Sequence, residues 1–465
     1  MKKRPDLSTM THDEKDALIL MLFARIEELE RRLGLDSSNS SKPPGNDGFR
    51  KKPHPKSLRQ KTGKTSGGQE GHEGKNLRQV VNPDKVIDHC PSSCSCGEAL
   101  GIAQSTGYKK RQVFDIPKPQ PALVTEHRAH SCRCARCGKK TESAFPEDVT
   151  APAQYGANTS ALVVYLQAWN LIPEDRVAAF MRDIFGVDMA TSTIAAMAQR
   201  KAAEWKALAK HIGDLVKKTA VKHMDETGYR IAKALQWLHV ASTNLLTFYR
   251  TGKRGDMLEG VSGIIVHDFW RSYFNIEGVE HALCNAHHLR ELQALMDFEK
   301  EKWAFEMFRF LRHACHAANV AREQNKPLKP SFLKWLLARY DRIIAQGLAY
   351  HESLPPIERP TLKKRRGKQR RRTGHNLVIR LRDHKEMALR FLVNPDVPFS
   401  NNQAERDIRM MKLRLKISGC FRSETGADSF ATLRTVLSTA KKQGWNIFNT
   451  LSQPTHFLVG RLRIA

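Results

Sequence analysis

Residues 219–274 limit the possible folds of this chain more than any other stretch. Three runs there have the texture of β-strands joined by short turns: AVKHMDETGYRI, LQWLHVAS and LLTFYR. A fourth run, GIIVH, is almost continuously apolar and stops at Asp268, as expected for a strand buried on both faces. A meander followed by a buried strand predicts a mixed sheet, and helical segments on both sides place the chain in the α/β class.

Two acidic residues mark this predicted sheet. Asp225 lies in HMDETG and Asp268 follows GIIVH, and we expect each of them at the end of a strand. One such acid is usually a turn former. If the two strands are neighbours, however, both carboxylates lie at the same edge of the sheet. Oxygen ligands placed in this way can hold two Mg²⁺ or Mn²⁺ ions roughly 4 Å apart, an arrangement suited to in-line displacement at phosphorus.

The segment PFSNNQAERDIRMMKLRLKISGCFR, residues 398–422, combines one glutamate with many basic residues. The pair Ser400 and Gln403 has the form of a capping box, which predicts a helix that begins near residue 401. On that helix Glu405, Arg409 and Lys412 share one face, beside an apolar stripe of Ile408, Met411 and Leu415. A solvated helix with a Glu–Arg pair also explains the pattern.

The charge of the chain indicates a polyanionic partner. Among 465 residues, 77 Lys and Arg face 48 Asp and Glu, which gives a formal charge of +29. We expect nucleic acid rather than membrane, because no basic amphipathic helix of the membrane type stands out. No run of 18 apolar residues occurs, and the N-terminal apolar stretch lacks a small-residue cleavage site. The nine cysteines are mostly clustered and suit a reducing, cytoplasmic setting.

The N-terminal part of the chain changes character at residue 36. Thr11 and Glu14 can cap a helix that runs to about Gly34, with a seam spaced 3, 4, 3, 4: Ile19, Leu22, Ile26, Leu29 and Leu33. The seam predicts a short coiled coil, and a helix packed on its own chain is the alternative. Residues 36–80 are rich in Ser, Gly, Pro and Lys, which predicts a disordered basic linker that can also contact phosphates.

Two cysteine clusters predict a metal module in residues 81–145. HCPSSCSCG contains Cys90, Cys94 and Cys96, and SCRCARCG contains Cys132, Cys134 and Cys137. Thiolates at C-x-x-C spacing can bind one tetrahedral zinc, each pair in a tight knuckle that ends in glycine. The alternating pattern between the clusters, residues 111–127, predicts strands of a zinc ribbon. Incidental thiols or a redox pair would give the same clusters.

Two further segments suggest contacts with DNA. Residues 158–200 contain a helix, a turn at Gly186-Val187 and a second helix that Thr191-Ser192-Thr193 can cap. This is the form of a helix-turn-helix, although an ordinary helical hairpin fits equally well. The block KKRRGKQRRR at 363–372 has eight basic residues in ten, which predicts a solvated loop or a DNA clamp.

Several motifs together resemble the DDE transposases of the insertion-sequence-66 family, and the resemblance covers nearly the whole chain. They are ARIEELERRLGLDSSNSSKPPGNDG, HCP…CG with C-x-x-CG, MDETGYR, VHDFWRSY, CNAHHLREL and FSNNQAERDIRMMKLRLKISGCFRSETGA. The resemblance implies an RNase H-like catalytic core with a helical insertion before the glutamate. It places the catalytic, metal-binding triad on Asp225, Asp268 and Glu405.

The resemblance also implies roles for residues around the triad. DNA contacts are expected at Arg409, Lys412, Arg414, Lys416 and His287 in the matched motifs. The charge of the basic block, and not the resemblance, adds Arg365, Arg366 and Arg370. In CNAHHLREL, metal binding by Cys284, His287 and His288 is the alternative to packing and DNA contact. The first knuckle departs from the family's CP-x-CG, because CPSSCSCG inserts residues and adds a cysteine. Cys90, Cys96, Cys134 and Cys137 fit best as zinc ligands, with Cys94 as a substitute.

The expected organisation has six parts. They are an N-terminal coiled coil (1–35), a linker (36–80), a zinc module (81–145), a helix-turn-helix-like region (150–212), a catalytic domain (213–450) with a helical insertion (about 296–395), and a C-terminal tail (451–465).

The predicted function is metal-dependent cleavage of element ends in double-stranded DNA and joining to target DNA. We expect a homo-oligomer, with accessory element-encoded proteins as further partners. A nuclease of the same fold, or a non-catalytic zinc and helix-turn-helix DNA-binding protein, is the alternative.

Overall fold

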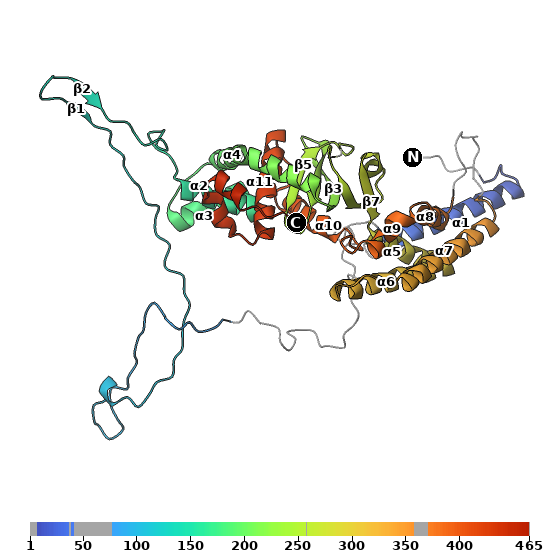
Figure 1. Cartoon of the computed structure of the whole chain (residues 1–465), viewed down its shortest axis with the longest axis horizontal. Coiled ribbons are helices and arrows are strands. Elements are labelled where there is room, and N and C mark those ends of the chain that lie inside the picture. The colour runs from blue at the N-terminus through green and yellow to red at the C-terminus, as the bar shows by residue number, and fades with distance from the viewer. Residues whose placement is uncertain (1–6, 37–38, 41–76, 257, 358–370, 465) are drawn as a thin grey trace.

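The structure is a computed structural model that describes residues 7–36, 39–40, 77–256, 258–357 and 371–464 (Figure 1). Arg365, Arg366 and Arg370 lie outside the described residues, as does most of the predicted linker and of the basic block.

A five-stranded mixed sheet forms the centre of the fold. Its strands are β3 (Val221–Ile231), β4 (Ala234–Ser242), β5 (Thr247–Gly252), β6 (Gly263–His267) and β7 (Val279–Leu283). Their order is β5-β4-β3-β6-β7, with β5, β4 and β3 antiparallel and β3, β6 and β7 parallel. The predicted meander and buried strand are confirmed. Strand β7 was not predicted, because VEHAL is short and carries two polar residues among its five.

Alternate residues of β3 face opposite sides of the sheet, as the two-residue period of a strand requires. Met224 joins the apolar core shared with the long helix α4 (Thr191–Lys218). Tyr229 joins a different cluster with Ile408 and Met411 of helix α10 (Asn402–Ser418). The odd-numbered residues of β3, Asp225 included, therefore face α10.

Helix α11 (Glu424–Lys442) protects the open edge of the sheet. The Thr439 hydroxyl accepts a hydrogen bond from the Thr247 amide (3.1 Å), and the Thr435 hydroxyl accepts one from the Tyr249 amide (3.0 Å). Unpaired amides on an edge strand invite pairing with other chains, and these threonines satisfy two of them on β5.

The predicted helix-turn-helix region forms helices that pack into this core (Figure 1). They are α2 (Ala157–Val164), the π-helical turn η3 (Tyr165–Trp169), α3 (Glu174–Phe185) and α4. Helix α3 ends at Gly186 with φ 66°, as the turn predicts, but the N-cap of α4 is Ala190, so capping by the Thr-Ser-Thr run is wrong. Helix α4 buries ten of its 28 residues. This packing favours the helical-hairpin alternative.

The C-terminal residues are folded rather than a tail. Helices α12 (Ile447–Ser452) and α13 (Thr455–Gly460) bury Leu451 and Leu458 in the same core as α4. The prediction of a tail missed them because each helix has only six residues, too few to show a helical period.

A second, helical core lies between β7 and α10. It contains the helices α5 (Asn285–Ala294), α6 (Lys302–Glu323), α7 (Pro330–Ser353), α8 (Thr373–Asp383) and α9 (Lys385–Val393), with the π-helical turn η5 (Leu295–Glu299) between α5 and α6. The short 3-10 turn η4 (Arg271–Asn275) precedes this region, between β6 and β7. Trp303, Phe310 and Tyr340 are among its fully buried aromatic residues. The chain is helical here, as predicted.

Residues 77–150 are extended, with two short regular elements, the turn η2 (Ile102–Gln104) and a hairpin of β1 (Ser131–Arg133) and β2 (Lys140–Glu142). The strands predicted at 111–127 are absent from this described segment. Its side chains are almost all exposed, and no neighbouring strand offers a ladder of hydrogen bonds.

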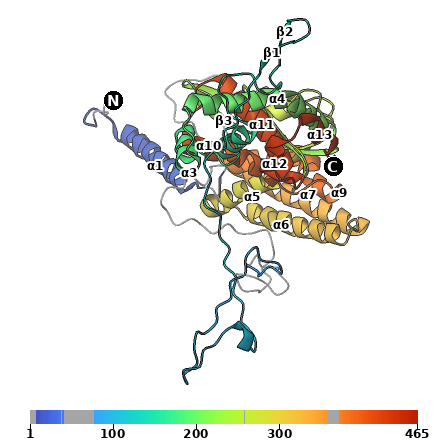
Figure 2. The ribbon, with the colours of Figure 1, turned by 90° about the vertical axis from the view of Figure 1, so that its left-hand side faces the viewer.

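Helix α1 (His12–Gly34) confirms the predicted capping box, in which Thr11 and Glu14 bond each other's backbone amides. The helix projects away from the folded body (Figure 2), and its seam residues Ile19, Leu22, Ile26, Leu29 and Leu33 are all exposed. At its C-terminal end, Gly34 lies against the ring of Phe298. Within the described residues, no helix is long and apolar enough to cross a membrane.

Candidate active site

Strand register brings Asp225 and Asp268 to one place in the sheet. The last β3–β6 pair joins His223 to Val266, and each aspartate lies two residues beyond it. Asp225 is inside β3 rather than at its end, because β3 continues in its antiparallel pairing with β4, where Asp225 opposes Val240. The predicted position at a strand end is therefore correct for Asp268 and wrong for Asp225. The parallel pairing of β3 with β6 ends just before the two aspartates, so both lie at the open end of that strand pair.

The two aspartates repel each other in the protein alone. Burial, together with the neighbouring Glu226 and Asp268 carboxylates, raises the pKa of Asp225 to about 8. Burial also raises the pKa of Asp268, with Glu226 again contributing. Each aspartate accepts one backbone amide at 2.9 Å, from Glu226 and Trp270 respectively. Carboxylates held together in this way favour the binding of a cation, which would offset their repulsion.

Asn401 positions the third acidic residue. Its backbone amide donates to the Cys284 sulfur (3.1 Å), and its side-chain amide donates to the Met224 carbonyl (2.7 Å). Helix α10 starts at the next residue and carries Glu405 one turn later. The predicted Ser400–Gln403 capping box does not form: Asn401 is the N-cap, and the Gln403 side chain bonds the Thr243 carbonyl and Asp407 instead.

Glu405 meets two residues that follow β7. Donor atoms of Cys284, His287 and Glu405 all lie within 4.8 Å of one another. Among the described residues, Glu405 Oε1 and His287 Nδ1 are buried and have no hydrogen-bond partner. Buried polar atoms are nearly always satisfied, so these two fit a ligand at this position. His288 points elsewhere, since it is fully buried and bonds Asn285 (3.1 Å).

Electrostatic coupling joins this cluster to the aspartates. Burial is the main cause of the raised pKa of Asp225, and the Glu405 carboxylate adds to it. Burial lowers the pKa of His287, and the Glu405 and Asp268 carboxylates act in the opposite direction. The structure therefore gathers the three predicted acidic residues and His287 in one region. Their oxygen-rich donor set suits a hard divalent cation such as Mg²⁺ or Mn²⁺.

The basic residues of α10 divide into two groups. Arg409, Lys412 and Lys416 are exposed, and their contact with phosphates stays a prediction. Arg414 instead places its guanidinium 3.7 Å from the centre of the Phe421 ring, and burial lowers its pKa. This stacking fixes the Arg414 side chain on the protein and leaves it less free to contact DNA than the other three.

Sequence reasoning missed a buried acidic residue beside the aspartates. The Glu226 side chain is 3% exposed and accepts a hydrogen bond from the Tyr273 hydroxyl (2.5 Å). Arg254 lies 3.4 Å from the same carboxylate and 3.4 Å above the Trp270 ring. The available signal was the consecutive acids of MDETG, since an acid in a strand interior needs a partner.

The cysteine clusters form two local turns that are not brought together. The Gly97 amide donates to the Cys94 carbonyl (3.0 Å), and the Gly138 amide donates to the Cys134 carbonyl (2.8 Å), with both glycines at positive φ. Hydrogen bonds from nearby backbone amides lower the pKa of the Cys94 and Cys134 thiols. The β1–β2 hairpin and the loop around residue 100 lie far apart in both views (Figures 1 and 2).

Comparison with known proteins identifies the class as transposase. Residues 152–429, more than half of the chain, match the family described as "Transposase IS66 family". The chain belongs to the IS66 transposase family. Residues 2–78 match a separate family of unknown function (DUF6444). Among curated proteins, none matches the chain.

Proposed function

We propose that this protein is a DDE transposase that cleaves DNA at the ends of its element and joins the freed 3′-hydroxyl to target DNA. Asp225, Asp268 and Glu405 are the proposed triad. The observation that carries the proposal is the register of β3 and β6, which sets both aspartates in one row opposite the helix that carries Glu405. The strand order, with three antiparallel strands followed by two parallel ones, supports an RNase H-like core.

The three carboxylates would hold one or two divalent cations, which supply positive charge at the reacting phosphate and favour ionisation of the attacking hydroxyl. The protein's own residues do the positioning. Asn401 fixes the start of α10 and so orients Glu405 toward the aspartates. Arg409, Lys412 and Lys416 are exposed and contact phosphates beside the site. Such contacts position the DNA and do not read its sequence.

We further propose that Cys90, Cys96, Cys134 and Cys137 bind one zinc ion, with Cys94 able to substitute. The glycine turns and the lowered thiol pKa values at Cys94 and Cys134 support knuckles that favour thiolates. Binding would require the two turns to approach each other, so the module would gain its fold from the metal.

The deciding experiment is a cleavage and joining assay on DNA that carries the element ends, with Mg²⁺, beside a binding assay. Asp268→Asn and Glu405→Gln remove charge with little change of shape, so each should lower the rate roughly a thousandfold or more while end binding survives. Asp297→Asn and Glu424→Gln, at exposed positions, are the matched controls. Parental rates in both triad variants would refute the proposal, and cleavage without joining by the parent would identify a nuclease.

A further inference from the structure

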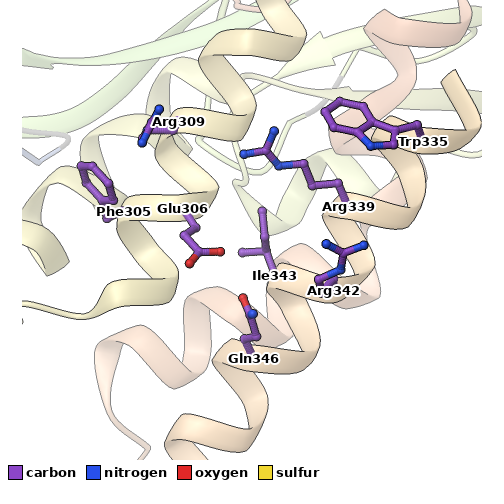
Figure 3. A pocket seen from close by; sticks show the side chains of 8 residues that line it. All are labelled: Phe305, Glu306, Arg309, Trp335, Arg339, Arg342, Ile343 and Gln346. Carbon is purple, nitrogen blue, oxygen red and sulfur yellow. The ribbon is translucent and has the colours of Figure 1, made fainter. Parts of the chain in front are cut away.

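A cavity of about 480 Å³ lies between helices α6 and α7 of the helical insertion (Figure 3). Its walls include three arginines, two aromatic residues and one glutamate: Arg309, Arg339, Arg342, Phe305, Trp335 and Glu306. Arg339 extends from α7 into the space between the two helices, and Arg309 lies across from it on α6 (Figure 3). None of these residues belongs to the candidate active site.

The three arginines carry positive charge that the described protein does not neutralise. In the part of the chain that the structure describes, none of them forms an ion pair, and Glu306 approaches none of them closely enough to do so. Other basic residues of the same insertion are paired, as Arg380 is with Glu291 (2.5 Å). Three positive charges around one cavity repel one another, and a bound anion would offset that repulsion.

The aromatic walls add a second kind of contact. Trp335 is 46% exposed and Phe305 is 47% exposed, which is high for such large apolar side chains. Phe332 stacks behind Trp335, with ring centres 5.7 Å apart and an interplanar angle of 13°, so the indole is braced on one side. Arg339 and Arg309 lie near the rings of Trp335 and Phe305, at 5.4 and 5.6 Å. A braced, exposed indole beside arginines provides a surface on which a base can stack.

We propose that this pocket binds an unpaired nucleotide of a DNA strand. The arginines contact its phosphates, and Trp335 stacks on its base. A simple anion would use the charges and leave the aromatic walls in water, whereas a nucleotide uses both. The cavity volume falls within the usual range for small-molecule sites, roughly 300–1,000 Å³. This inference rests on the proposed function for its ligand, because cleavage creates DNA ends, where a terminal base leaves its pair at less cost than inside a duplex.

Fluorescence anisotropy of the full chain with a labelled 20-nucleotide single strand tests the inference, with its duplex, heparin and polyglutamate as competing ligands. Arg339→Gln with Arg342→Gln should raise the Kd for the single strand about tenfold more than Arg312→Gln with Lys334→Gln. The control pair removes equal charge at exposed positions of α6 and α7 that do not line the pocket. Trp335→Ala should raise the Kd for the single strand about tenfold and leave the Kd for heparin unchanged. Trp335→Phe should keep most of the affinity for the single strand, because it retains an aromatic ring.

Equal losses in the pocket pair and the control pair would overturn the inference. So would a Trp335→Ala loss as large for heparin as for the single strand, which would indicate a plain anion site. Pocket-dependent binding of polyglutamate in place of DNA would indicate an acidic protein partner. Thermal unfolding confirms that each variant is folded. The pocket variants report on binding and the Asp268 variant on cleavage, so either proposal can fail alone.

Discussion

The ring of His223 on β3 and the side chain of Asn401 are joined by a hydrogen bond of 3.0 Å in the interior of the protein. The Asn401 amide nitrogen donates to the Met224 carbonyl, so the Asn401 side-chain oxygen faces His223 and accepts a hydrogen bond from Nδ1–H. Burial lowers the pKa of His223 to about 4, so at neutral pH the ring is the neutral Nδ1–H tautomer. This bond ties the strand that carries Asp225 to the first residue before α10.

Replacing Asn401 with alanine should loosen that tie. We expect Asn401→Ala to lower the free energy of unfolding by about 1–3 kcal/mol, since it leaves His223 and the Met224 carbonyl unsatisfied. Cleavage should fall about tenfold or more because Glu405 is no longer held in place. Asn402→Ala, at the exposed next residue, is the control. Urea unfolding and the cleavage assay measure the two effects, and a normal rate in Asn401→Ala would show that Glu405 is positioned by other contacts.

Stability should depend on the protonation of His223 in acid. Burial lowers its pKa to about 4, with Lys442 also lowering it and Asn401 and Asp407 acting in the opposite direction. The unfolded chain binds this proton below about pH 6.5, whereas the folded protein binds it only near pH 4. The parent should therefore lose up to roughly 3 kcal/mol relative to His223→Gln as the pH falls through this window. Chemical unfolding in EDTA at several pH values measures it, and parallel curves would contradict the prediction.

Asp225→Asn should make the metal-free protein more stable and abolish its response to metal. The folded pKa of Asp225, about 8, lies above that of the unfolded chain, 3.8, so the parent loses stability as the pH rises through this interval. The variant has no carboxylate to ionise there. Thermal unfolding at pH 8 should show a higher midpoint for the variant without metal. Added Mg²⁺ should raise the midpoint of the parent alone, and an equal rise in both would place the metal elsewhere.

The predicted zinc module can be tested by measuring the zinc content of the protein. Metal analysis of the full chain should find one zinc per molecule, lost in Cys134→Ser and retained in Cys420→Ser, whose exposed thiol lies outside both clusters. Single substitutions of Cys90, Cys94 and Cys96 then show which two of these three thiols complete the site. Absence of zinc from protein purified without chelator would assign the clusters to another role.

The exposed seam of α1 predicts self-association. Leu22→Lys with Leu29→Lys should dissociate oligomers, because two charges would enter the apolar contact between helices. Leu20→Lys is the control, since Leu20 is 70% exposed and lies outside the seam. Analytical ultracentrifugation compares them. The same assembly in all three proteins would mean that α1 does not join the copies.

The sheet and the acidic residues were predictable where the signal was local. The meander, the buried strand before Asp268 and the capping box of Thr11 and Glu14 each depend on a few neighbouring residues. Glu405 could not be predicted as a site residue from local sequence, because its spacing does not distinguish it from the other acidic residues. Its assignment to the triad depended on the family resemblance alone.

Features that depend on distant partners were not visible. Ser400 and Gln403 have the form of a cap, but Asn401 gains more by bonding across to β3, so tertiary contacts decide the helix start. Strand β7 is buried by its neighbours rather than marked by its own composition. Glu226 has two partners that are distant in sequence: Tyr273 lies 47 residues and Arg254 lies 28 residues along the chain.

The helical insertion leaves and rejoins the core at a single point. The amide of Asn285, where α5 begins, donates to the carbonyl of Phe399, just before α10 (3.1 Å). The Arg322 guanidinium donates three hydrogen bonds to the carbonyls of residues 391, 395 and 397, where the chain returns to the sheet. Because the two ends are clamped together, the length of what lies between them does not alter the geometry of the acidic residues. The helices beyond α5 can therefore change in length while the acidic residues keep their positions at the edge of the sheet.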